Sequence, residues 1–257
     1  MSLPFVFTLP HSSQEVPAEV RPDLALGQEQ IFANVDLGAS EVFADQPGLA
    51  VLPADYSRLV VDLNRNALNH GAKGVIAATD YTGRAIFRPG REPDADTVRL
   101  RVERYWLPWH GRLDKLLNTP GCKGLIDCHS LDGTGPAEAP DPGQRRADLT
   151  LGNNGGPEGE PHPAKEGRLA CPPPVLQALG RALERRGLSV AYNQPYSGGY
   201  IAQHYGPRLQ AQGAFALQIE INKDLLAEAG YTRVRPERAA ELRRLVAEAL
   251  QELAAGL

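Results

Sequence analysis

The chain has 257 residues, of which 42% are hydrophobic and 23% are charged. This composition is ordinary for a globular protein and excludes global disorder, and the length fits one α/β domain spanning 1–257. The formal net charge of −4 argues against a nucleic-acid partner, since a nucleic-acid-binding protein normally carries a basic excess. No apolar run reaches the roughly 20 residues that cross a bilayer and no signal peptide opens the chain, so we expect a cytoplasmic protein without a membrane partner.

Short apolar runs, typical of buried strands, alternate along the chain with stretches of helical periodicity. The predicted strands cover 3–9, 49–53, 58–63, 124–128, 148–151, 188–192 and 214–221, and the predicted helices cover 28–43, 96–117 (with a kink or break at Pro108), 175–186 and 236–253. This alternation predicts an α/β fold with a mixed, mostly parallel central sheet and helices on both faces. Loops over 64–93 and 136–174 are long, and loops of that length are usually functional.

Four predicted strands end in polar residues that catalysis commonly uses. These are His11, Asn64 with Arg65, His129 and Glu220. Because ligands of open α/β sheets bind beyond the carboxyl ends of the strands, we expect these side chains to meet at one edge. Two histidines, an arginine and a glutamate suit a metal hydrolase, whose ion keeps one position open for water. Each residue alone has a structural interpretation as well, such as a surface ion pair for Arg65, so the prediction rests on the combination.

Eight short motifs occur in the order found in the N-formylglutamate amidohydrolases, and this resemblance spans about residues 5 to 225. The motifs are Pro10–Ser12 (PHS), Ser57–Arg65 (SRLVVDLNR), Phe87–Gly90 (FRPG), Asp127–Ser130 (DCHS), Leu151–Gly156 (LGNNGG), Ser197–Ile201 (SGGYI), His204–Gly206 (HYG) and Gln218–Glu220 (QIE). The resemblance implies the zinc carboxypeptidase fold, a mixed eight-stranded sheet covered by helices. It also implies hydrolysis of an N-acyl amino acid, with N-formyl-L-glutamate cleaved to formate and L-glutamate in histidine degradation as the leading case.

The same resemblance implies one zinc or other divalent ion per chain, held by His11 and His129. The third ligand is open between two carboxylates. Asp36 falls where the family has an aspartate after the first strand, and Glu15 follows the position of the carboxypeptidase glutamate, which is Gln14 here. We favour Asp36, whose structural interpretation is a charge at a helix N-terminus.

The resemblance further implies a role for each remaining site residue. Glu220 is the expected general base, and Arg65, beside Asn64, the expected clamp on the substrate α-carboxylate. Arg88 is expected to take a side-chain carboxylate, and Tyr200 and His204 to bind substrate or the developing oxyanion. His110 has a helical context that favours a core or supporting role.

Several alternatives stay open at this point. A carboxypeptidase or a cell-wall amidase could use the same scaffold, and a binding protein of this fold would need no catalysis. The loops over 66–85 and 136–174 depart from the family pattern and could border the pocket, so the acyl group and the amino acid are undecided. The physiological metal and the oligomeric state are open as well.

Overall fold

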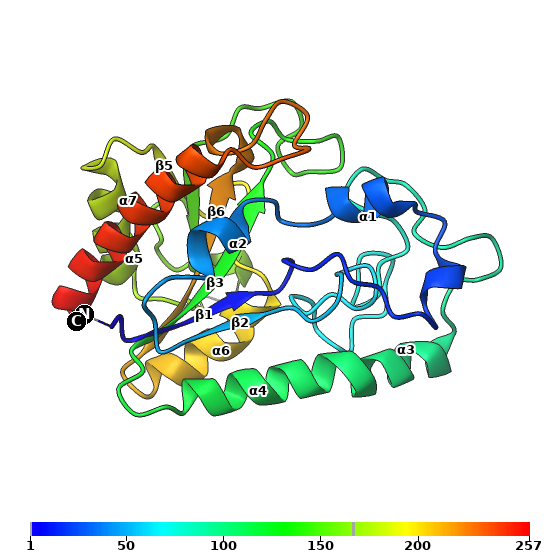
Figure 1. Cartoon of the computed structure of the whole chain (residues 1–257). Coiled ribbons are helices and arrows are strands. Elements are labelled where there is room, and N and C mark those ends of the chain that lie inside the picture. The colour runs from blue at the N-terminus through cyan, green and yellow to red at the C-terminus, as the bar shows by residue number, and fades with distance from the viewer. Residues whose placement is uncertain (1, 166–167) are drawn as a thin grey trace.

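The computed structural model describes residues 2–165 and 168–257; Met1 and residues 166 and 167, which belong to the long loop predicted over 136–174, lie outside the described part. The described residues form a six-stranded sheet in the order β2-β1-β3-β6-β4-β5 (Figure 1). The strands are β1 (Phe5–Leu9), β2 (Ala50–Pro53), β3 (Gly124–Leu131), β4 (Leu149–Gly152), β5 (Val190–Tyr192) and β6 (Phe215–Asn222). Only the β4–β6 pair is antiparallel within this sheet. The predicted α/β class with a mixed, mostly parallel sheet is confirmed, but the described residues form six strands and not the eight that the resemblance implied.

The three central strands, β1, β3 and β6, are buried along their whole length. Helices cover both faces of the sheet, which explains why these strands are nearly continuous apolar runs. A Cβ atom at Gly124 would come within 2.7 Å of the ring of Phe215, its partner on β6, so a glycine is needed at this close approach. β3 and β6 stay in register over eight residues, which sets His129 directly opposite Glu220.

Two hydrophobic cores lie on the two faces of the sheet. The first face is covered by α2 (Ala39–Phe43), α5 (Pro173–Glu184) and α7 (Pro236–Ala255), and the second by α4 (Leu107–Leu117) and α6 (Tyr200–Gln210). Successive residues of a strand point to opposite faces, so Phe5 and Phe7 belong to the first core and Val6 to the second. The sheet is thereby held rigidly from both sides beneath its carboxyl edge.

The prediction of one continuous helix over 28–43 is wrong. This stretch is divided into α1 (Gln28–Ala33) and α2, and the segment between them contains Gly38, whose φ is +87°. Glycine adopts this left-handed conformation without steric cost, so the chain can turn there. The turn has a functional consequence, because the interrupted segment carries Asp36 to the carboxyl edge of the sheet.

The strand predicted over 58–63 is also wrong, since this segment forms turns. Its apolar residues are buried, but they pack in two directions. Leu59 and Val60 join a third core away from the sheet, whereas Val61 and Leu63 pack into the core beneath α4. These apolar residues are therefore buried without a neighbouring strand, and the amide of Asp62 donates to the carbonyl of Val75 in the adjacent loop.

The helix predicted over 96–117 is continuous but not uniform. It consists of α3 (Ala95–Arg101), a π-helical turn (Val102–Trp106) and α4, and the irregularity lies before Pro108 instead of at it. Proline has no N–H to donate, and the wide π turn just before it adjusts the hydrogen-bond ladder.

α6 has no counterpart among the predicted helices, because Gly206 and Pro207 obscure its periodicity. Within residues 2–165 and 168–257, no helix has both the length and the apolar character needed to span a membrane.

Candidate metal centre and active site

A cavity of about 530 Å³ opens at the carboxyl edge of the central strands. His11 follows β1, His129 lies near the end of β3, and Glu220 lies near the end of β6; all three line the cavity. Residues from the two long loops line it as well, for example Tyr81 and Glu138. The polar strand ends therefore meet at one edge, where the carboxyl ends of parallel strands bring side chains together.

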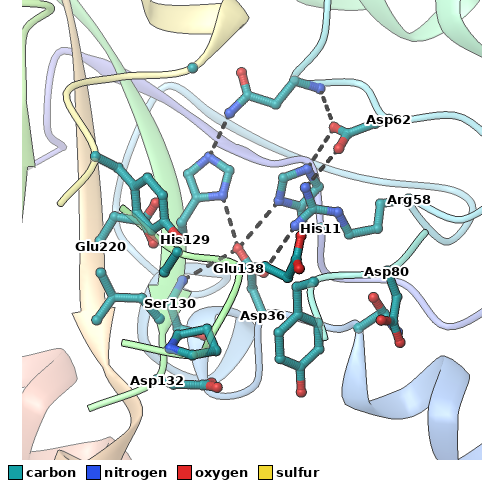
Figure 2. Close-up of a pocket in the computed structure, with 18 of the residues that line it drawn as sticks. His11, Asp36, Arg58, Asp62, Asp80, His129, Ser130, Asp132, Glu138 and Glu220 are labelled. Carbon is teal, nitrogen blue, oxygen red and sulfur yellow. Dashed lines mark hydrogen bonds and ion pairs between the residues drawn. The ribbon is translucent and has the colours of Figure 1, made fainter. Parts of the chain in front are cut away.

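Asp36 lies between the two histidines (Figure 2). Its backbone N–H donates to the carbonyl of His11 at 3.0 Å, which fixes the loop against the end of β1. Its Oδ2 atom is 3.4 Å from Nδ1 of His11 and 2.9 Å from Nδ1 of His129. One ligand atom from each of the three residues lies within 4.8 Å of the others, so this largely buried group could hold a metal ion. Glu15, the other candidate, is exposed and lies outside the group.

The far nitrogen of each imidazole is bound by a buried carboxylate. Nε2 of His11 is 2.8 Å from Oδ1 of Asp62, and Nε2 of His129 is 2.9 Å from Oδ2 of Asp127. A carboxylate can only accept, so Nε2 of each ring donates to Asp62 or Asp127, and with a metal bound Nδ1 would lose its proton and direct its lone pair to the ion. This is the second hydrogen bond that metal-binding histidines normally make, and it sets both tautomers for ligation.

These two carboxylates are themselves held in place. Arg58 donates to Asp62 at 2.7 Å, and Thr8 donates to Asp127 at 2.8 Å. Burial raises the pKa of Asp62, but the Arg58 guanidinium and the His11 imidazole outweigh it and hold this pKa well below its usual range. Asp62 is therefore ionised throughout the physiological range.

The electrostatics at Asp36 and His129 favour cation binding. Burial raises the pKa of Asp36, but the attraction of His11 and the hydrogen bonds of both imidazoles lower it far more. Burial lowers the pKa of His129, yet Asp127 and the other surrounding carboxylates reverse this and raise it well above its usual value. Asp36 is thus an anion beside a nitrogen that attracts a proton. A divalent cation would compete with that proton, so metal affinity should fall on acidification.

Glu220 faces the same cavity without belonging to the three-residue group. Burial raises the pKa of Glu220 to about 7, with the attraction of His129 offsetting only part of the effect. A carboxyl group that titrates near neutrality suits general base catalysis. Gln218, two residues earlier on the same face, donates to Oε1 of Glu220 at 2.9 Å and accepts from the backbone N–H of Gly199 at 2.7 Å.

The Asn64–Arg65 segment forms another wall. The Asn64 amide is buried, lies 3.2 Å from Oδ2 of Asp127, and accepts from the backbone N–H of Ile201 at 2.8 Å. A Cβ atom at Gly199 would come within 2.3 Å of this amide, so only glycine permits the approach of that loop. The Arg65 side chain lines the cavity and donates to the Asn64 carbonyl at 3.1 Å.

Three residues predicted to bind substrate lie away from the cavity lining in the described part of the chain: Arg88, Tyr200 and His204. Arg88 is exposed and donates from Nε to the carbonyl of Leu24 at 3.1 Å. The rings of Tyr200 and His204 stack on each other with centroids 4.9 Å apart on α6.

His110 lies behind the Asn64–Arg65 segment, in the supporting position that its helical context favoured. Its Nε2 is 2.9 Å from the carbonyl of Leu63, so Nε2 carries the proton and Nδ1 accepts from the Tyr205 hydroxyl at 2.9 Å. Burial lowers the pKa of His110 to about 4, which keeps the ring neutral.

Sequence reasoning missed several residues of this site, namely Arg58, Asp62, Asp127 and Gln218. One of them was detectable: Asp127 precedes His129 by two positions on β3. Such residues of a strand share a face, so an aspartate two residues before a predicted ligand is a signal for a supporting carboxylate.

Comparisons with known proteins agree with this geometry. The family model described as N-formylglutamate amidohydrolase matches residues 3–227. The chain is 28% identical to the N-formylglutamate deformylase of Pseudomonas putida, covering 88% of this chain and 82% of the relative. It is also 28% identical to the N-formylglutamate deformylase of Pseudomonas aeruginosa, covering 98% and 93%.

Two solved structures share the fold. The crystal structure of N-formylglutamate amidohydrolase from Ralstonia eutropha JMP134 superposes with a TM-score of 0.78 at 24% identity, covering 99% of this chain and 94% of that one. The gene product Atu2144 from Agrobacterium tumefaciens superposes with a TM-score of 0.68 at 20% identity, covering 97% and 91%. At these identities the superpositions establish the arrangement of the sheet and helices.

Proposed function

The chain belongs to the N-formylglutamate amidohydrolase family, and on that premise we propose that it is a metal-dependent hydrolase of the amide bond of N-acyl amino acids. The observation that carries the proposal is the meeting of the His11–Asp36–His129 group with Glu220 in one cavity. Three ligands leave coordination positions for water and substrate, and the separate carboxylate supplies a base.

The nitrogen and oxygen donors of this group fit a zinc-like ion, and we propose that one Zn²⁺ or similar ion binds per chain. Such an ion, when bound, would polarise the scissile carbonyl and lower the pKa of a water molecule. Asp62 and Asp127 would hold the two imidazoles in the required tautomer.

The chain's own residues would then move the proton and orient the substrate. Glu220 takes a proton from water as the water oxygen bonds to the acyl carbon, and returns it to the amine nitrogen as the C–N bond breaks. Arg65 pairs with the α-carboxylate, for which its planar fork is suited. The proposal assigns no substrate contact to Arg88, Tyr200 or His204, because these residues do not line the cavity.

N-formyl-L-glutamate is the first substrate to test, since the Pseudomonas relatives are named for its deformylation. The products would be formate and L-glutamate. The decisive assay measures formate released from N-formyl-L-glutamate and acetate released from N-acetyl-L-glutamate by the metal-loaded protein. Hydrolysis of dipeptides or cell-wall peptides instead would favour the carboxypeptidase or amidase alternative, and hydrolysis of none would favour a binding protein.

The metal is tested independently of activity. Mass spectrometry of the purified chain should find about one divalent ion per molecule, and His11→Ala and His129→Ala should each lose it while remaining folded. Asp36→Ala should also lose the ion, whereas Glu15→Ala is the matched control and should retain it. Full occupancy in the histidine variants would refute the site.

A further inference from the structure

The charged side chains that line the cavity differ in whether they have a partner of opposite charge. Besides the carboxylates around the metal-binding group, the lining contains five cations. They are Arg58, Arg65, Lys73, Arg146 and Lys223. A substrate side chain that carries a carboxylate needs a cation to recognise it. Whether each of these five cations is already paired with a carboxylate of the protein therefore decides which substrate side chains the cavity can select.

Four of the five cations already have a carboxylate partner. Arg58 binds Asp62 at 2.7 Å, Lys223 binds Asp132 at 2.9 Å, and Lys73 lies 3.6 Å from Glu138. Arg146 makes two hydrogen bonds to Asp141, at 2.8 and 2.7 Å.

The pairs differ in how firmly they are held. The Arg146 and Lys223 side chains are 3% and 8% exposed, so their pairs lie largely out of water. Lys223 also lies over the rings of Tyr81 and Tyr231, which hold the ammonium group in place. The Lys73–Glu138 pair is about half exposed at the rim, where solvent and salt screen charge and selectivity is small.

Arg65 is the exception. Among the described residues, it is the only cation of the cavity lining without a carboxylate within 4.0 Å. The proposed function gives this cation to the α-carboxylate that every N-acyl amino acid carries. No uncompensated cation then remains for a second carboxylate, whichever direction the side chain takes from the α-carbon.

We infer that this cavity recognises one carboxylate only, so that its substrates are N-acyl amino acids with uncharged polar side chains as well as glutamate. The inference rests on the proposed function of the same site. A glutamate side chain would have to share a cation with an existing carboxylate, whereas a glutamine side chain can accept from the Arg146 N–H groups that neither Asp141 nor the Asp132 carbonyl occupies. A site built around a specific polar partner discriminates by ~10⁴-fold or more, and this cavity lacks such a partner for the side-chain charge.

The test compares two substrates of nearly equal shape, N-formyl-L-glutamate and N-formyl-L-glutamine, by kcat/KM from released formate. We expect the two values to agree within about tenfold, and a larger preference for glutamate overturns the inference. If neither substrate is cleaved, the proposed function fails. The binding of N-acetyl-L-glutamate and N-acetyl-L-glutamine, measured by calorimetry with the same tenfold limit on the ratio of Kd, then decides the inference separately.

A single substitution should create the missing selectivity. Asp132→Asn keeps an oxygen acceptor for Lys223 but removes the charge that compensates it. The preference for N-formyl-L-glutamate over N-formyl-L-glutamine should then rise by about tenfold or more, because an unpaired, poorly solvated cation attracts a carboxylate strongly. Asp114→Asn, which makes the same change in an ion pair with Arg208 on the surface (2.7 Å), is the control and should leave the ratio unchanged. An unchanged ratio in Asp132→Asn, in a variant that keeps the wild-type melting temperature, would contradict the role of the existing ion pairs.

Discussion

Glu220 shows how much chemistry one strand position can determine. Its neighbours Ile219 and Ile221 point into the core of the opposite face, while Gln218 shares its face and donates a hydrogen bond to it. A buried carboxylate is costly unless it has partners, and burial accordingly raises the pKa of Glu220 to about 7. A group of this pKa can take up and release a proton near neutral pH.

Replacing Glu220 with Gln should separate chemistry from metal binding. The variant keeps the shape and the hydrogen bond of the side chain but cannot take a proton, so kcat for the N-acyl substrate should fall by ~10²–10⁴-fold. Metal content, measured by mass spectrometry, should equal that of the wild type because Glu220 is not proposed as a ligand. Near-normal kcat would remove Glu220 from the mechanism, and loss of the metal would reassign it as a ligand.

Arg65 offers a second separation, between binding and chemistry. Arg65→Lys keeps the charge and loses the planar fork, so KM should rise by ~10-fold while kcat changes little. The readout is a full Michaelis–Menten series with N-formyl-L-glutamate. Arg208→Lys, at a surface ion pair, is the control with the same chemical change. If KM is unaffected by Arg65→Lys, the α-carboxylate is held elsewhere.

The long helix that runs from α3 through the π-helical turn to α4 supports the site from behind. Two of its tryptophans donate from the indole nitrogen to a backbone carbonyl: Trp106 to Arg65 at 3.0 Å, and Trp109 to Pro53 at 2.9 Å. Only the first carbonyl belongs to the segment that lines the cavity. With His110 bound to the Leu63 carbonyl, this helix holds the backbone on both sides of Asn64.

This pair of tryptophans provides a matched test of the element. Trp106→Phe and Trp109→Phe each leave a carbonyl without its donor, so both should lower the free energy of unfolding by ~1–3 kcal/mol. Only Trp106→Phe should also raise KM, by several-fold, because it releases the Arg65 backbone. Equal KM values in the two variants would show that the contact is structural alone.

At the scale of the whole molecule, the neutral His110 side chain makes the free energy of unfolding depend on pH. Burial lowers the pKa of His110 from 6.5 to about 4, so the unfolded chain binds a proton on this residue at a higher pH than the folded chain does. The stabilisation is complete above pH 6.5 and is lost as the pH falls through the window from 6.5 to about 4. At 1.36 kcal/mol per pKa unit, the loss attributable to this group is about 3 kcal/mol.

The comparison of wild type with His110→Gln isolates this contribution. Glutamine can still donate to the Leu63 carbonyl but does not titrate. Between pH 7 and pH 4 the free energy of unfolding, from urea titrations, should fall by about 3 kcal/mol more in the wild type than in the variant. Parallel pH profiles would place the acid sensitivity in other groups.

We also propose that residues 1–257 form one domain, for which these titrations should show a single transition.

The sequence by itself determined the class of the fold and the edge at which the chemistry lies. Apolar runs with polar ends predict buried parallel strands, and parallel strands place their carboxyl ends side by side. The proximity of His11, His129 and Glu220 could therefore be predicted from the sequence. The order of the motifs indicated the family, which the family model confirmed. These inferences succeed because they depend on local patterning.

The tertiary structure alone decided which of the remaining polar residues reach that edge. Asp36 contacts His129 across 93 positions of the chain because Gly38 turns the backbone, and Arg88, in a matching motif, is exposed and donates to Leu24 instead. The segment 58–63 contains a short apolar run like that of a buried strand, yet it packs between two cores without a strand partner. Such outcomes depend on contacts between segments far apart in the sequence, where packing overrides local preference. For the same reason, the pairing of four of the five cavity cations with carboxylates could be seen only in the folded chain.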